Sequence, residues 1–256
     1  MAKAKAEVKL AKVRDEDVLD HLNDMTPEEL KHFRECNAKH REEISRRKVR
    51  NLISGLIKRI IDLLAGIVGT ILLIPLTIVV AIMKVINREN GPIFYDQLRI
   101  GKKGKIFKMY KFRSMVIGAD DILQDYLDNN PDAKKEYDIN KKLKEDPRIT
   151  KTGYFLRKTS LDEFPQFINI LFGQMSLVGP RPYLPREKED MGDYYKYIIQ
   201  MKPGLTGPWQ VAGRSNLTFE DRLKLDEEYC SRRGNRRDLK IIFKTFKKVF
   251  KDDGAI

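Results

Sequence analysis

An uncharged apolar stretch of 21 residues, Leu63–Met83, limits the folds open to this chain more than any other segment. Lys58 and Arg59 precede it and Lys84 follows it. About 20 apolar residues in a helix are enough to cross the hydrocarbon of a bilayer, and a helix without a polar face is otherwise stable only when protein surrounds it. The stretch lies well inside the chain and no small-residue cleavage pattern follows, which argues against a secretory signal. We predict a membrane-inserted helix.

Pro75 lies in the middle of this stretch. Proline removes one helical hydrogen bond and clashes with the carbonyl four residues earlier, so we expect a kink near residues 71–75. The kink is incidental in a spanning helix, whereas in a re-entrant helix it returns the chain to the face from which it came. Both flanks are strongly basic, which favours the re-entrant form with both ends at the cytoplasmic surface.

Composition leaves the partner open. The 256 residues carry a formal charge of +13, which attracts anions such as nucleic acid, lipid headgroups or phosphorylated metabolites. The two cysteines, Cys36 and Cys230, have neither disulfide-framework nor metal-ligand spacing, so a reducing, cytosol-facing location fits best.

Residues 91–113 are typical of two short strands joined by a Gly/Lys turn. In the second strand we expect Ile106, Lys108, Tyr110 and Phe112 on one face, and the other face is formed by Phe107, Met109, Lys111 and Arg113. Interleaved basic and aromatic residues are compatible with single-stranded nucleic acid or with a membrane surface. The neighbouring apolar stretch favours the membrane.

Two adjacent carboxylates, Asp162 and Glu163, follow Ser160. If Ser160 is an N-cap, Glu163 completes a capping box and Asp162 complements the helix dipole, without any catalysis. Residues 164–172 then form the apolar face of a helix that ends at Gly173.

The same pair is also suited to phosphoryl chemistry. A carboxylate can act as a nucleophile on phosphorus when a divalent cation reduces the repulsion between anions, and carboxylates are ligands of Mg²⁺ beside substrate phosphates. Arg157, Lys158 and Arg181 could supply positive charge, and Arg181 is restricted by the prolines on either side of it.

The C-terminal part fits a domain at a membrane surface. Trp209, in the Gly/Pro-rich loop 202–210, suits either the membrane interface or a packed loop, and Asn216 or Thr218 is expected to cap the next helix. Residues 239–250 predict a basic amphipathic helix that lies either among headgroups or against the core.

Six blocks, which occur between about residues 57 and 250, make the sequence similar to the bacterial sugar transferases, the monotopic polyprenol-phosphate phosphoglycosyl transferases. The blocks are Lys58-Arg-Ile-Ile-Asp62, Gly91-Pro-Ile-Phe94, Tyr110-Lys-Phe-Arg-Ser-Met115, Leu156-Arg-Lys-Thr-Ser-Leu-Asp-Glu-Phe-Pro-Gln166, Met175-Ser-Leu-Val-Gly-Pro-Arg-Pro182 and Lys202-Pro-Gly-Leu-Thr-Gly-Pro-Trp-Gln210. The family's re-entrant helix is broken by Ser-Pro, where this chain has Ile74-Pro75 and lacks the serine hydroxyl.

The resemblance implies transfer of sugar-1-phosphate from a UDP-sugar to polyprenol (undecaprenyl) phosphate, with release of UMP. It implies that Asp162 is the covalent nucleophile and Glu163 its partner, that both carboxylates hold Mg²⁺, and that Lys111 and Arg157 are active-site cations. Exopolysaccharide or O-antigen-type synthesis is the expected setting, at the cytoplasmic face of the bacterial inner membrane.

The resemblance also assigns residues to substrate binding. Arg181, with Pro180 and Pro182, is expected near the nucleotide, and Arg113 is expected to contact substrate. Membrane lipid is an expected partner, nucleic acid is not, and a homodimer is compatible with the sequence.

The predicted fold is α+β and mainly helical. It comprises a charged N-terminal extension with a helix (1–50), which Thr26 and Glu29 would cap, a re-entrant, Pro-broken membrane helix (51–88), and a membrane-surface catalytic domain (89–256) with a small β-hairpin and amphipathic helices. Two other functions stay open from the residues alone, a membrane-tethered nucleic-acid-binding protein and a non-catalytic membrane adaptor whose acidic pair only caps a helix. The identity of the sugar is not encoded in any short motif.

Overall fold

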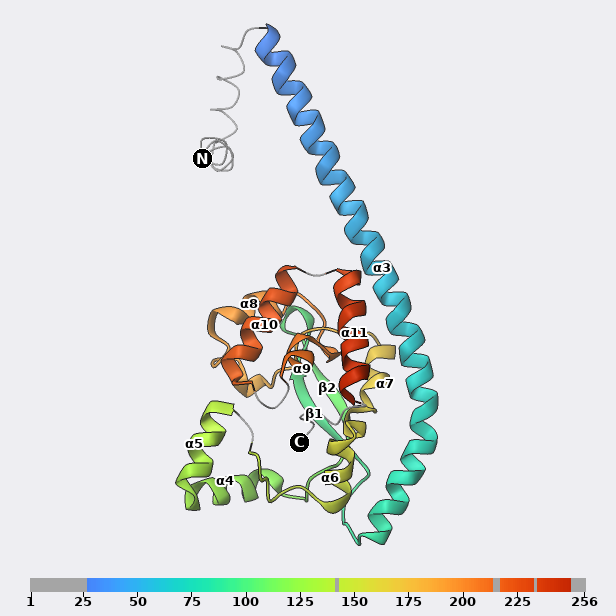
Figure 1. The fold of residues 1–256 in the computed structure, drawn as a ribbon, viewed down its shortest axis with the longest axis vertical. Helices are drawn as coiled ribbons and strands as arrows, with labels where there is room; N and C mark the ends of the chain where they lie inside the picture. The colour runs from blue at the N-terminus through green and yellow to red at the C-terminus, as the bar shows by residue number, and fades with distance from the viewer. Residues whose placement is uncertain (1–26, 141–142, 214–216, 233, 250–256) are drawn as a thin grey trace. The chain divides into compact units, whose positions relative to one another are not determined.

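The computed structural model describes residues 27–140, 143–213, 217–232 and 234–249. It divides into two compact units, an N-terminal unit (1–55) and a C-terminal unit (56–256). The N-terminal unit contributes the first part of helix α3 (Pro27–Ile86), and the expected cap at Thr26 lies outside the described residues. The remaining described elements belong to the C-terminal unit (Figure 1).

Short helices dominate the C-terminal unit, as the sequence predicts. Its elements are β1 (Phe94–Ile100), η1 (Lys102–Gly104), β2 (Ile106–Phe112), α4 (Ala119–Asn129), α5 (Pro131–Asn140), α6 (Lys151–Lys158), η2 (Leu161–Glu163), α7 (Gln166–Leu171), β3 (Ser176–Val178), η3 (Pro185–Glu187), η4 (Gly192–Tyr194), α8 (Tyr195–Ile198), β4 (Gly204–Thr206), α9 (Pro208–Ala212), α10 (Phe219–Ser231) and α11 (Asn235–Val249).

The predicted hairpin is confirmed. Strands β1 and β2 pair antiparallel, from Phe94 opposite Phe112 to Ile100 opposite Ile106. Phe107 and Met109 are buried, as alternation requires, but Phe112 is also buried although we expected it on the opposite face. Phe112 belongs to a core cluster that includes part of α3, and this packing overrides simple alternation.

A second, parallel pair was not predicted. Strands β3 and β4 match Ser176 with Gly204 and Val178 with Thr206. Each strand has only three residues, too few for a periodic pattern. This pair positions the Gly179–Pro182 loop, which follows β3 directly.

Helix α3 continues through Pro75 without an interruption in its helical residues. The chain therefore does not turn back through a loop at this proline. Figure 1 shows that the part of α3 in the C-terminal unit curves instead. The Thr77 hydroxyl donates to the Leu73 carbonyl (2.7 Å), a back-bond of the kind that bends helices.

One stripe of α3 is hydrogen-bonded to the rest of the C-terminal unit, beginning at Arg59 and Asp62. Asp62, only 3% exposed, accepts hydrogen bonds from the Ser176 hydroxyl (3.0 Å) and the Leu177 amide (2.8 Å). Arg59 donates to the last carbonyls of α7, those of Ile170 and Leu171. These groups are held inside the protein, although the sequence suggested only a basic flank.

The stripe continues toward the end of α3. A side chain at Gly69 would overlap the ring of Phe167, and Leu73 and Val80 are buried beside Phe112. Beyond Val80, the Asn87 side chain donates to the Thr152 hydroxyl (3.0 Å). The contacts within α3 form a seam, made by Arg59, Asp62, Gly69, Leu73 and Val80. Its residues lie three, four or seven positions apart, which places them on one helix face.

The opposite face of α3 is apolar and exposed. Its large side chains are between 44% and 78% exposed, and they include Ile57, Ile60, Leu64, Ile67, Val68, Ile71, Leu72, Ile74, Ile78, Val79, Ile82 and Val85. The segment Leu52–Ile86 is long and apolar enough to cross a membrane, and only 22% of its most apolar window is buried by protein. A contiguous apolar face of this size is typical of contact with a membrane or a partner.

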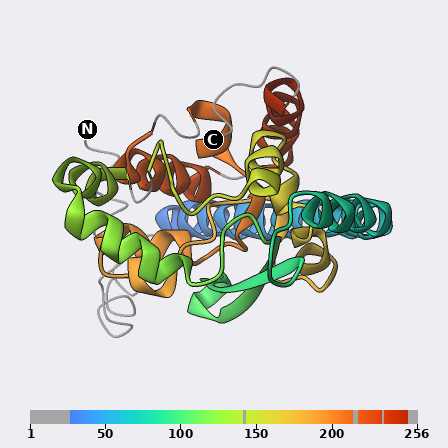
Figure 2. The same ribbon diagram turned by 90° about the horizontal axis from the view of Figure 1, so that it is seen from below.

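Seen from below, the hairpin and α11 lie on opposite sides of the last part of α3 (Figure 2). Helix α11 buries Ile241 in the core but exposes Leu239, Phe243 and Phe246. The core-packing interpretation is confirmed for Ile241. The exposed apolar side chains beside lysines are compatible with the headgroup interpretation, which stays a prediction.

Candidate active site

The acidic pair does not form the expected helix cap. Ser160 adopts a left-handed conformation (φ 57°) and makes no side-chain cap, and the pair lies in the 3₁₀ turn η2 before α7 begins at Gln166. The Ser160 amide donates to the Arg157 carbonyl instead of to Glu163. The capping-box interpretation is therefore wrong, and the helix does end at Gly173 (φ 75°), as predicted. Phe172, expected on the buried face, is 73% exposed.

Lys111 joins the two carboxylates. Its Nζ lies 2.9 Å from Glu163 Oε1 and 3.5 Å from Asp162 Oδ2. The Asp162 side chain is 12% exposed and that of Glu163 is 36% exposed, so the aspartate is the more desolvated member of the pair. This arrangement brings together three of the four predicted catalytic residues.

Asn169 on α7 holds these elements in place. Its carboxamide accepts from the Tyr110 amide (3.0 Å) and donates to the Lys108 carbonyl (2.7 Å), and the residue is fully buried. The turn that carries the acidic pair is thereby fixed beside the strand that carries Lys111. The sequence analysis missed Asn169, whose one signal was an amide within an apolar helix.

The environment moves the two carboxyl pKa values apart. Burial raises the pKa of Asp162 above its ordinary value, and the attraction of Lys111 offsets this only in part. Burial acts on Glu163 in the same direction, but Lys111, followed by Arg181 and Arg99, outweighs it and holds the pKa of Glu163 below its ordinary value. A pair with separated pKa values can give two carboxylates two different roles.

Arg157, the fourth predicted catalytic residue, lies in the last turn of α6. Its Nε donates to the Ser114 hydroxyl (3.0 Å), and its charge lowers the pKa of Asp162. The sequence analysis missed Ser114, which orients this cation. Gly153 lets α6 lie directly against the backbone of Ser114, because a side chain at Gly153 would overlap the Ser114 carbonyl.

Arg113 is placed near Lys111 through Tyr95 rather than by contact with the acidic pair. Its guanidinium stacks on Tyr95, 5.2 Å from the ring centre, and Tyr95 is the cross-strand partner of Lys111. Directly opposed residues share one face of a hairpin, so Arg113 lies beside the Lys111 face. No described contact joins Arg113 to Asp162 or Glu163.

The Gly179–Pro182 loop is held through its backbone. The Pro180 carbonyl accepts from the Gly204 amide (2.8 Å), and the Pro182 carbonyl accepts from Arg99 Nη1 (2.8 Å). The prolines thus fix the loop, and Arg181 lies between them.

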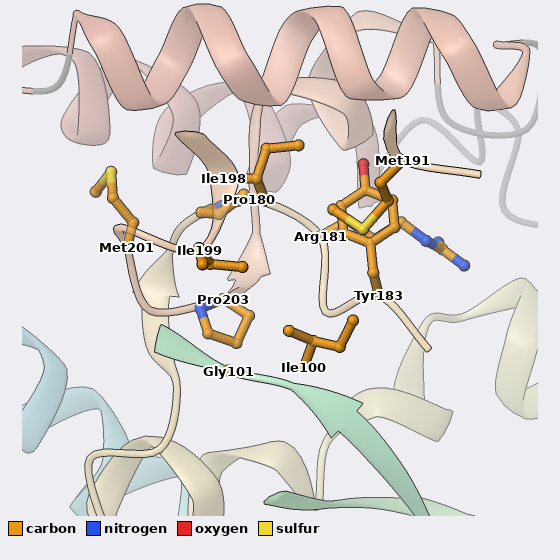
Figure 3. Close-up of a pocket in the computed structure, with 10 residues that line it drawn as sticks. All are labelled: Ile100, Gly101, Pro180, Arg181, Tyr183, Met191, Ile198, Ile199, Met201 and Pro203. Atoms are coloured by element: carbon orange, nitrogen blue, oxygen red, sulfur yellow. The ribbon is translucent and has the colours of Figure 1, made fainter. Parts of the chain in front are cut away.

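The guanidinium of Arg181 does not face the apolar pocket beside the loop. A small pocket lies next to the loop, and its lining is mostly apolar. In Figure 3 the guanidinium of Arg181 points away from the aliphatic side chains of this pocket. It stacks instead on Trp209, 5.0 Å from the ring centre, so Trp209 is a packing residue of α9.

The donor set suits Mg²⁺ with substrate phosphates as additional ligands. The described residues contain no group of three or more His, Cys, Asp or Glu able to enclose a metal. Mg²⁺ commonly takes one or two carboxylates and completes its shell with phosphates and water, which is what Asp162 and Glu163 can offer.

Comparisons with known proteins identify the class to which this fold and site belong. Residues 53–252 match the family model described as bacterial sugar transferase, and the chain belongs to this family, as the sequence resemblance predicts. The members are enzymes, and most of the C-terminal unit falls within the match.

Individual relatives extend this finding. The chain is 43% identical over 202 residues to the undecaprenyl-phosphate galactose phosphotransferase of Salmonella typhimurium, in a match that covers 79% of this chain and 42% of that protein. It is 40% identical to the exopolysaccharide production protein ExoY of Rhizobium meliloti, over 79% of this chain and 89% of ExoY. It is 37% identical to the UDP-glucose:undecaprenyl-phosphate glucose-1-phosphate transferase of Klebsiella pneumoniae, over 80% of this chain and 42% of that protein. The chain thus spans about two fifths of the length of several relatives.

Proposed function

We propose that this protein transfers sugar-1-phosphate from a UDP-sugar to undecaprenyl phosphate through a covalent phosphosugar intermediate on Asp162. The observation that carries the proposal is the buried Asp162, which Lys111 bridges to Glu163. The pair is not part of a helix-capping box. The names of the relatives support the substrate pair.

The first step forms a bond between the Asp162 carboxylate oxygen and the phosphorus that carries the sugar. The bond from that phosphorus to the bridging oxygen breaks, and UMP leaves with the electron pair. Lys111 and Arg157 reduce the repulsion between the attacking carboxylate and the diphosphate. A bound Mg²⁺, held by Asp162 and Glu163, would neutralise further phosphate charge.

In the second step an oxygen of undecaprenyl phosphate attacks the same phosphorus. The bond to Asp162 breaks, and the carboxylate is regenerated with formation of undecaprenyl-diphospho-sugar. Glu163, whose pKa is held low, stays ionised beside Lys111 throughout. Its exposure toward solvent suits a group that holds cations at the substrate.

The alternatives lose part of the observations that motivated them. Both lysines of β2 form ion pairs, Lys111 with the acidic pair and Lys108 with Asp96 (3.3 Å). The adaptor hypothesis rested on the capping box, which does not form.

A screen of UDP-sugars tests the reaction and its donor together. Full-length protein in detergent, with Mg²⁺ and undecaprenyl phosphate, is expected to release UMP from at least one UDP-sugar in a panel of hexoses, acetamido sugars and deoxy sugars. Omission of undecaprenyl phosphate should limit release to about one UMP per enzyme. No UMP release from any donor would contradict the proposal.

We also propose that α3 attaches the protein to the cytoplasmic face of the membrane without spanning it. Lys58 near the start of the α3 seam donates to the Val178 carbonyl (2.8 Å), and Asn87 after the seam bonds to Thr152. Both ends of the apolar segment are thus tied to one polar unit, which cannot lie on both sides of a bilayer.

Topology labelling tests this attachment. Single cysteines at Val49 and Lys105, in a chain with Cys36 and Cys230 replaced by serine, should react with an impermeant maleimide from the cytoplasmic side only. A periplasmic control protein in the same cells reports leakage. Labelling of the two cysteines from opposite sides would mean that α3 spans the membrane.

A further inference from the structure

Three arginines from separate parts of the chain lie in or beside the Gly179–Pro182 loop. Arg99 of β1 is 7% exposed and Arg222 of α10 is 3% exposed, and Arg181 lies between the two prolines of the loop. Arg181 and Arg222 both stack on Trp209, at 5.0 and 5.5 Å from the ring centre. Among the described residues, none of the three forms an ion pair with a carboxylate.

Their donors are only partly used inside the protein. Arg99 donates to the Pro182 carbonyl and to Gln97, and Arg222 donates to the Leu217 carbonyl (2.7 Å). Within the part of the chain that the structure describes, the Nε atoms of all three arginines are buried without a hydrogen-bond partner. The indole N–H of Trp209 is likewise buried and unpaired there, so four buried donors of this cluster lack acceptors.

The charges of this cluster repel one another. Burial first, and then the nearby Arg181, lowers the pKa of Arg99 and the pKa of Arg222 to about 10 each. Two buried carboxylates face the three arginines of the cluster. Asp226 accepts from the Arg181 amide and the Tyr183 hydroxyl, and burial raises its pKa to about 7. Glu187 accepts from the Leu184 amide, and its charge opposes the lowering of the pKa of Arg99 and of Arg222. The cluster therefore has an excess of buried positive charge that an anion would relieve.

The cluster also lies within electrostatic reach of the acidic pair. Arg181 and Arg99 both lower the pKa of Glu163. An anion held by the cluster would therefore interact electrostatically with Glu163, the partner of the proposed nucleophile.

We infer that Arg99, Arg181 and Arg222 form an anion site for the nucleoside phosphate that leaves in the first step, with Arg99 and Arg222 as substrate-binding residues in addition to Arg181. The identity of the anion rests on the proposed function, whereas the existence of the site does not. Guanidinium groups with free donors bind phosphate oxygens in charge-assisted hydrogen bonds.

Binding measurements test this site apart from turnover. Full-length protein in detergent is titrated with UMP and, separately, with inorganic pyrophosphate. Arg99→Gln and Arg222→Gln are each expected to weaken both affinities by about ten- to a hundredfold, the loss of one hydrogen bond to a charged group. Arg237→Gln is the matched control, because Arg237 stacks on Tyr229 but has its own carboxylate, Glu228, and it should bind as the wild type does.

The thermal midpoint without ligand identifies variants that fail to fold. Arg99→Lys and Arg222→Lys keep the charge but lose the planar set of donors, so they are expected to fold and to lose less affinity than the glutamine variants. If the folded variants bind UMP and pyrophosphate as the wild type does, the inference is wrong. If pyrophosphate binding depends on the arginines but no UDP-sugar yields UMP, the anion site stands and the proposed function fails.

Discussion

Replacement of Asp162 by asparagine is expected to reduce UMP release by a factor on the order of 10⁴ or more, because the amide cannot form the phosphosugar intermediate. The substitution keeps the shape of the side chain, and Lys111 would keep its 2.9 Å contact with Glu163. Since burial raises the pKa of Asp162, the ionised carboxylate is disfavoured in the folded state at neutral pH. We therefore expect the thermal midpoint of Asp162→Asn to equal or exceed that of the wild type.

Turnover of the wild type should fall as the pH drops through the raised pKa of Asp162, since only the carboxylate is a nucleophile. Glu163→Gln serves as the comparison, because it removes the partner charge and leaves the nucleophile in place. It should reduce turnover less than Asp162→Asn and should shift the acid limb to lower pH, because a repelling carboxylate has been removed. An Asp162→Asn protein that keeps most of its turnover would contradict the assignment.

A single methyl group at Gly179 is expected to be nearly as damaging, through the fold rather than the chemistry. A Cβ at this position would overlap the Lys202 carbonyl, and one at Gly204 would overlap the Gly179 amide. The two backbones approach because the Gly179 amide donates to Thr206 (2.9 Å) and the Gly204 amide donates to Pro180. Gly179→Ala should therefore cost roughly 2–4 kcal/mol of stability and displace the loop that carries Arg181.

Thermal or denaturant unfolding of the variant measures this cost. Gly234→Ala is the matched control, since a Cβ at Gly234 meets nothing within 4 Å, and it should change the free energy of unfolding by less than about 1 kcal/mol. Any Gly179→Ala protein that still folds should bind UMP more weakly. Equal stability of the two variants would mean that the loop can move away without cost.

Local patterns in the sequence predicted the parts of the fold that depend on neighbouring residues. The apolar stretch 63–83 is helical, the Gly/Lys turn forms the hairpin, and Thr218 caps α10 by accepting from the Asp221 amide. The capping pattern at Ser160 resembles that at Thr218 and fails, because α6 continues to Lys158 and Ser160 then reverses the chain in a left-handed conformation.

Long-range contacts explain what the sequence did not predict. The acidic pair was predictable as a motif, but its bridge to Lys111 depends on Asn169, which fastens α7 to β2. Arg99 and Arg222 are far apart in the chain. Arg99 bonds to the Pro182 carbonyl and Arg222 stacks on Trp209, so no local sequence pattern links them. The seam of α3 likewise arises from packing against the rest of the C-terminal unit, to which this part of α3 belongs.

Intact-protein mass spectrometry after incubation with a UDP-sugar and Mg²⁺, without undecaprenyl phosphate, tests the central claim most directly. The donor is chosen from the UMP-release screen. The wild type is expected to gain the mass of one sugar phosphate, fragmentation should locate it on Asp162, and added undecaprenyl phosphate should remove it. An unmodified wild type that still releases UMP and forms lipid product, or a mass gain that persists in Asp162→Asn, would contradict covalent catalysis by Asp162.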